Sequence, residues 1–107
     1  MEQLPIALKL QGRKVVVTGG GTVAARKTDL ALRAGANVLV IAPELSSEFV
    51  TLEKMPRFRH RAGTVERADL DGAILAFGCT EDEDGDTRLY ELAHAAGAMV
   101  NVPDNPE

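Results

Sequence analysis

The chain has 107 residues, 45% of them hydrophobic, and its sixteen acidic and twelve basic residues give a formal net charge of −4. This size suits a single globular domain, and the negative charge argues against nucleic acid as the main partner. No run of eighteen apolar residues is present, so we expect no membrane-spanning segment.

We expect the chain to act in the cytoplasm. Its opening residues, MEQLPIALKL, lack the cationic start, apolar stretch and small-residue cleavage site of an export signal. Cys79 is the only cysteine and cannot form an internal disulfide, which fits a reducing compartment.

The first part of the chain predicts a strand, a helix and a second strand. Lys14–Thr18 holds a continuous apolar run that ends at glycine, as expected of a strand buried on both faces. Apolar residues recur at helical spacing from Thr22 to Ala34, and Gly35 closes this helix as its C-cap. Asn37–Ala42 is a second buried strand.

A helix and an edge strand are expected next. Ser46 or Ser47 can cap a helix that runs to about Lys54 and is stopped by Pro56. The sequence RFRHR alternates strictly over Arg57–Arg61, which is typical of an exposed or edge strand.

The remaining chain predicts two more strands around one helix. The segment 62–72 has room for only one helical turn, at Glu66–Leu70. Ala73–Phe77 is a buried apolar run, followed by the acidic loop EDEDGD and a helix from about Thr87 to Ala96. Met99–Val102 is the last strand.

Strands that alternate with helices indicate βαβ units and a parallel sheet, because a parallel crossover needs about a dozen residues. With right-handed crossovers the expected strand order is 3-2-1-4-5. We therefore predict an α/β fold of the Rossmann type, a doubly wound parallel sheet of about five strands, with residues 1–107 forming one nucleotide-binding domain.

Three residues between the first strand and the first helix match the pattern G-x-G-x-x-A: Gly19, Gly21 and Ala24. In this pattern the first glycine permits a tight turn, the second lets the backbone approach a pyrophosphate, and the small third residue allows close helix packing. Unpaired amides at the helix start then hold the phosphates. Because strand, turn, helix and second strand agree, we interpret the glycines as a dinucleotide site rather than only a turn.

The acid that binds the adenosine ribose would normally end the second strand, near Ala42. Here the sequence is Ala42–Pro43–Glu44, so the carboxylate comes two residues late. Two roles fit Glu44: it reaches the ribose, or it caps the following helix. No arginine lies directly at the turn to receive a 2′-phosphate, which favours NAD over NADP.

Three segments together resemble the precorrin-2 dehydrogenase family, the N-terminal module of siroheme synthases: LPIALKLQGRKVVVTGGGTVAARK, CTEDEDGD and NVPDNPE. The leading L-P-I, the triple glycine followed by x-V-A-x-R-K, and N-V-x-D after the fifth strand carry the resemblance. It implies NAD⁺-dependent oxidation of precorrin-2 to sirohydrochlorin, both tetrapyrroles, and in many members insertion of Fe²⁺ to make siroheme.

The resemblance also implies site residues. The nucleotide-binding backbone of the family falls on Thr22, Val23, Pro43 and Glu44, and its essential carboxylate falls on Asp104. The candidate cofactor-binding residues are thus Gly19, Gly20, Gly21, Thr22, Val23, Pro43, Glu44, Cys79 and Thr80.

The chain departs from the family pattern at two points. Asp86 stands where the family usually has asparagine, near the cofactor cleft. The helical segment that forms the family's homodimer and walls the tetrapyrrole site would lie beyond Glu107. A homodimer is therefore expected only for a form that includes that segment.

Asp104 can also be argued from its own position. It follows the fifth strand, on the rim where ligands bind in sheets of this kind. Loss of a hydride from a reduced tetrapyrrole leaves a carbon acid whose proton a carboxylate can accept. The plain alternative is a turn, for which Pro, Asp and Asn are favoured residues.

Other candidates are weaker. Arg57, Arg59 and Arg61 would line one face of their strand, and we interpret them as charges that protect an edge rather than a grip on substrate carboxylates. We expect no preformed metal site, because His60 and His94 lack metal-ligand spacing. Cys79 suits a small buried hydrophobe better than a nucleophile, and EDEDGD lacks the spacing of a calcium loop.

Two rival functions are set against this one. A short-chain dehydrogenase would need a Tyr-x-x-x-Lys pair, and this pair is absent because Tyr90 is followed four residues later by His94. A regulatory module that binds NAD without catalysis is the alternative of a different class.

Overall fold

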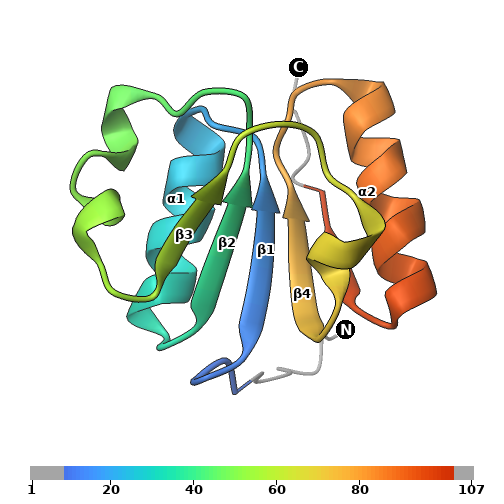
Figure 1. The fold of residues 1–107 in the computed structure, drawn as a ribbon, viewed down its shortest axis with the longest axis horizontal. Coiled ribbons are helices and arrows are strands. Elements are labelled where there is room, and N and C mark those ends of the chain that lie inside the picture. The colour runs from blue at the N-terminus through green and yellow to red at the C-terminus, as the bar shows by residue number, and fades with distance from the viewer. Residues whose placement is uncertain (1–8, 103–107) are drawn as a thin grey trace, which may run out of the picture.

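The computed structural model describes residues 9–102, which form one parallel sheet with helices on both faces (Figure 1). The strands are β1 (Lys14–Thr18), β2 (Asn37–Ile41), β3 (Phe58–Arg61), β4 (Ala73–Gly78) and β5 (Met99–Asn101), and the helices are α1 (Thr22–Arg33) and α2 (Glu83–Ala96). Their order in the sheet is β3-β2-β1-β4-β5, and every neighbouring pair is parallel. The predicted α/β fold and strand order are confirmed.

The valines of β1 explain why it is the central strand. Val15, Val16 and Val17 are fully buried, and successive side chains enter cores on opposite faces of the sheet. The core beside α1 includes Val15, Val17, Val38, Val40, Ala24 and Ala31, and the core beside α2 includes Val16, Ile41, Ala76, Leu89 and Ala93. In Figure 1, α1 lies behind the sheet and α2 lies beside β4.

The single helix expected from Ser46 or Ser47 to Lys54 is wrong. Two short 3₁₀ turns occupy this segment, η1 (Ser47–Phe49) and η2 (Leu52–Lys54). Phe49 and Leu52 are three residues apart and both are buried. A 3₁₀ turn places residues three apart on one side, whereas the β-branched pair Val50–Thr51 between the turns disfavours a continuous α-helix.

Helix α2 begins at Glu83, about four residues before the predicted start at Thr87, so most of the acidic segment is helical rather than a loop. Glu83, Asp84 and Asp86 occupy its first turn, where negative charge is favourable beside the positive end of the helix dipole. The helix ends at Gly97, in the left-handed conformation with φ of 82°.

None of the helices formed by residues 9–102 has the length and apolarity needed to cross a bilayer.

Strand β3 is an edge strand, as predicted, because it pairs only with β2. It begins at Phe58 rather than Arg57, and β5 ends one residue early, at Asn101. The single turn expected at Glu66–Leu70 is present as η3 (Arg67–Leu70). A capping box between Glu66 and Asp69 stabilises the start of this turn.

Candidate functional site

A cleft opens at the carboxyl ends of the strands, where the strand order reverses around β1. Thr18 at the end of β1 is in register with Ile41 of β2 on one side and with Gly78 of β4 on the other. The cleft has a volume of about 460 Å³ and is lined by Thr18, Gly19, Gly20, Ile41, Pro43, Gly63, Thr64, Val65, Thr80, Asp82, Asp84, Gly85 and Arg88. This is the place in an open α/β sheet where ligands bind.

The first two glycines of the turn are required by the fold itself. Gly19 has φ of +111°, and a Cβ there would overlap the carbonyl group of Cys79. A Cβ on Gly20 would overlap the carbonyl oxygen of Glu44. The Gly20 carbonyl also accepts a hydrogen bond of 2.8 Å from the Ser46 amide. These contacts hold the turn against the loops that follow β4 and β2.

Gly21 differs from its neighbours because nothing lies within 4 Å of the position a Cβ would take. It is the N-cap of α1, has no side chain to cap the helix, and adopts an extended backbone with φ of −97°. The first turn of α1 contains no acidic residue. The start of α1 therefore combines unpaired first amides with open space beside Gly21 and no acidic residue of its own, which fits an anionic phosphate.

An acidic side chain nevertheless approaches this helix from another part of the chain. The Thr22 hydroxyl donates a hydrogen bond of 2.7 Å to Glu48 Oε1. Capping of the following helix was one of the two roles expected for Glu44. The N-cap of η1 is Ser46, so Glu44 does not take that role. Glu44 is exposed, and its backbone packs on Gly20 at the edge of the turn.

Two arginines hold the opposite wall of the cleft, formed by residues 63–65. Arg61 forms an ion pair with Asp69 and donates a hydrogen bond of 2.9 Å to the Thr64 carbonyl. Arg88 Nε on α2 donates a hydrogen bond of 3.0 Å to the Val65 carbonyl. Burial alone would raise the pKa of Asp69, but hydrogen bonds from Arg61 and from the Glu66 amide lower that pKa below its usual value.

The loop between β4 and α2 is organised by Asp86. Its Oδ1 accepts hydrogen bonds from the Thr80 hydroxyl at 2.8 Å and from the Thr80 amide at 3.2 Å. An asparagine oxygen could accept the same two bonds, so Asp86 adds a negative charge to the cleft without changing this geometry.

The Cys79 side chain is buried and its thiol is unreactive. Burial, together with the charge of Asp86, raises the pKa of its thiol to about 11, against the opposing effect of Lys27. The thiol is therefore protonated at neutral pH and is a poor nucleophile. This agrees with the prediction of a small buried hydrophobe.

The structure brings together part of the predicted set of cofactor residues. Gly19, Gly20, Pro43 and Thr80 line the cleft itself. Gly21, Thr22 and Val23 stand at the start of α1, Glu44 lies beside the turn, and Cys79 contributes its backbone. Asp104 lies outside the described residues.

Sequence reasoning missed two side chains that shape this site, Glu48 and Arg88. Each acts through a contact with a residue distant in sequence, 26 positions for Glu48 with Thr22 and 23 positions for Arg88 with Val65. No local sequence pattern predicts such contacts.

His60 Nε2 is 2.8 Å from the Ala42 carbonyl, and residues 9–102 contain no group of three side chains able to hold a metal ion.

Comparison with known proteins places this chain among NAD(P)-binding domains. The model of the NAD_binding_7 family, described as NAD(P)-binding, matches residues 6–107. A siroheme synthase of Methylobacillus flagellatus is 42% identical over 107 residues, and one of Chromobacterium violaceum is 41% identical over 107 residues; each match covers 100% of this chain and 23% of the relative. The chain thus spans about a quarter of the length of these relatives.

A solved structure, that of SirC, a precorrin-2 dehydrogenase, superposes with a TM-score of 0.81 at 28% identity. The match covers 98% of this chain and 51% of SirC. The fold therefore has a direct structural counterpart.

Proposed function

This chain belongs to the NAD_binding_7 family of NAD(P)-binding domains, and on that premise we propose that it is the NAD-binding module of a precorrin-2 dehydrogenase. The complete protein would oxidise precorrin-2 to sirohydrochlorin during siroheme biosynthesis. The siroheme synthase relatives and the SirC structure support this reaction class.

The observation that carries the proposal is the contrast among three consecutive glycines. A Cβ would overlap backbone at Gly19 and Gly20 but would meet nothing at Gly21. Close packing explains the first two glycines, and no contact within the described residues explains the third. A pyrophosphate that approaches Gly21 and the amides after it supplies the reason.

The roles of the chain's own residues follow from this placement. The amides of Thr22 and Val23 would hold the pyrophosphate, and the segment Pro43–Glu44 would contact the adenosine ribose. Bound NAD⁺ supplies a hydride acceptor. Asp104, which follows β5 in the sequence, would accept the proton that the substrate loses with its hydride.

The proposal extends to three properties of the complete protein. It would form a homodimer, it would also take Fe²⁺ as a substrate for insertion into sirohydrochlorin, and it would act in the cytoplasm. The lone buried thiol of Cys79 is consistent with a reducing compartment. The carboxylate of Asp104 could receive the protons that metal insertion displaces from the pyrroles.

The direct test is an optical assay of NAD⁺-dependent sirohydrochlorin formation by the protein extended with its natural downstream sequence. We expect turnover with NAD⁺ and a loss of turnover in Gly21→Val. If the extended protein binds both NAD⁺ and precorrin-2 but forms no sirohydrochlorin, the regulatory alternative that binds NAD without catalysis replaces this proposal.

A further inference from the structure

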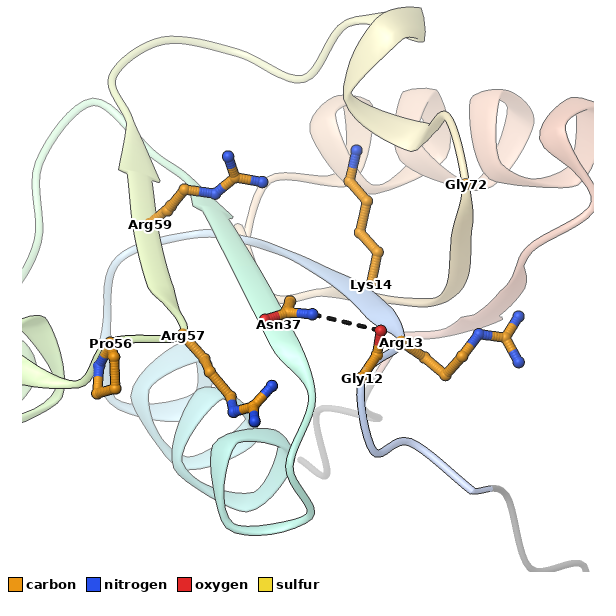
Figure 2. Close-up of a pocket in the computed structure, with 8 residues that line it drawn as sticks. All are labelled: Gly12, Arg13, Lys14, Asn37, Pro56, Arg57, Arg59 and Gly72. Carbon is orange, nitrogen blue, oxygen red and sulfur yellow. Dashed lines mark hydrogen bonds between the residues drawn. The ribbon is translucent and has the colours of Figure 1, made fainter.

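A second cavity lies at the opposite end of the sheet, at the amino ends of β1, β2 and β3 (Figure 2). Its volume is about 380 Å³, and its lining consists of Gly12, Arg13, Lys14, Asn37, Pro56, Arg57, Arg59 and Gly72. Four of these residues are cationic and none is acidic. This is a concentrated positive charge on a chain whose net charge is −4.

The strand register explains why these side chains converge. Lys14 of β1 is in register with Asn37 of β2, and Leu39 of β2 is in register with Arg59 of β3. Register partners in a parallel sheet share a face, and residues two apart along a strand do too. Lys14, Asn37 and Arg59 therefore project from the same face, on the side where Val16 and Leu39 join the core beside α2.

Helix α2 leaves this part of the face open because it packs against β4 and β5. In Figure 2 the Arg59 and Lys14 side chains extend toward the same side, the Arg57 side chain extends the other way in this view, and the Arg13 side chain points away from the other two arginines. Asn37 Nδ2 donates to the Gly12 carbonyl at 3.3 Å, which holds the floor of the cavity in place.

The three arginines at and just before β3 have unequal partners. Arg61 is neutralised by Asp69, whereas no carboxylate of residues 9–102 lies within ion-pair distance of Arg57 or Arg59. Lys14 Nζ donates to the Asp71 carbonyl at 3.0 Å and contributes to the lowered pKa of Asp69, but it forms no ion pair with a carboxylate of the described residues. Lys14 on β1, Arg59 on β3 and Arg57 just before β3 therefore line one cavity, and none of the three forms an ion pair with a carboxylate of the described residues.

We propose that this cavity binds a small polyanion, one whose phosphate or carboxylate oxygens pair with Arg57, Arg59 and Lys14. The planar fork of each arginine suits two oxygens of a carboxylate or phosphate, and the lysine adds a point charge. The volume suits a small molecule. The site is separate from the glycine turn, since the five residues of β1 span about 15 Å between the two ends of the sheet.

The test is a titration of the ¹⁵N-labelled chain with pyrophosphate and, separately, with citrate, at constant ionic strength and followed by amide chemical shifts. We expect saturable shifts at Lys14, Asn37 and Arg59 with at least one probe. Pyrophosphate alone would identify a phosphate site, citrate alone a carboxylate site, and both together a site for anionic oxygens in general. Shifts at Gly21 and Thr22 report the nucleotide site independently, so failure of either site is visible by itself.

The variant Arg57→Gln/Arg59→Gln should weaken binding at the cavity at least about tenfold, because it removes two charge-assisted contacts. The matched control, Arg26→Gln/Arg67→Gln, removes two exposed arginines elsewhere and makes the same change in net charge. It should bind like the original chain. Equal weakening in both variants, or no saturable shift at the cavity with either probe, overturns the proposal and leaves the arginines as protection of an edge strand.

Discussion

Gly20 and Glu44 meet backbone to backbone: the carbonyl oxygen of Glu44 occupies the space that a side chain at position 20 would need. The contact is reinforced by the hydrogen bond of 2.8 Å from the Ser46 amide to the Gly20 carbonyl. The glycine turn and the loop after β2 are thus one packed unit. A change in the middle glycine should therefore affect folding before it affects binding.

Gly20→Ala is expected to destabilise the domain by about 1–3 kcal/mol, the usual cost of forcing an atom into a packed site. Thermal unfolding followed by circular dichroism measures this. Gly21→Ala is the matched control, because its Cβ would meet open space in an extended backbone. Equal melting temperatures for the two variants would contradict the packing described for Gly20.

Gly21→Val should fold normally and lose detectable NAD⁺ binding. Its extended backbone accepts a β-branched residue, whereas the branched side chain would fill the space in front of the first amides of α1. Isothermal titration calorimetry with NAD⁺ measures the effect, with circular dichroism as the check on folding. An unchanged dissociation constant in the folded variant would place the pyrophosphate elsewhere.

Glu44→Gln tests the ribose contact. If the carboxylate accepts hydrogen bonds from the ribose hydroxyls, its loss should weaken NAD⁺ binding about tenfold and reduce the preference for NAD⁺ over NADP⁺. Glu53→Gln on η2 is the charge-matched control and should have no effect. Wild-type affinity in Glu44→Gln would assign the ribose contact to backbone groups.

The raised pKa of Cys79 has a consequence for stability at high pH. The unfolded thiol ionises near pH 9, whereas the folded thiol ionises at about 11. The folded state therefore holds a proton that the unfolded state has lost, so stability falls as the pH rises from about 9 to 11. Cys79→Ala, which lacks this group, should show a shallower fall over the same range in urea unfolding. Parallel curves for the two proteins would contradict the shift.

Much of the fold is predictable because it is encoded locally. The buried run of β1 and the helical spacing after Thr22 specify a βαβ unit, and right-handed crossovers then specify the strand order. Failures occurred where a short segment had no strong period. The expected helix up to Lys54 divides at Val50–Thr51, and the acids predicted as a loop instead begin α2 at Glu83.

Of the candidate site, only the glycine turn of the backbone was predictable from the sequence. The glycines predict a tight turn before α1, because their spacing has a steric cause. The Thr22–Glu48 and Val65–Arg88 contacts depend on how distant loops pack. The two roles of the arginines on β3 differ for the same reason, since η3 brings Asp69 to Arg61 but leaves Arg59 without a described carboxylate partner.

The last prediction concerns Asp104, the proposed proton acceptor that follows β5 in the sequence. In the extended protein, Asp104→Asn keeps the shape of the side chain and removes its basic charge. Loss of a general base typically lowers the rate by about 10²–10⁴-fold, so sirohydrochlorin formation should fall in that range. NAD⁺ affinity should barely change, because the pyrophosphate is proposed to bind the backbone of the glycine turn and not this carboxylate. The two proteins are therefore compared at matched NAD⁺ occupancy. Turnover close to that of the unmodified protein would make Asp104 a turn residue, as Pro, Asp and Asn in this segment also allow, and would require a base elsewhere.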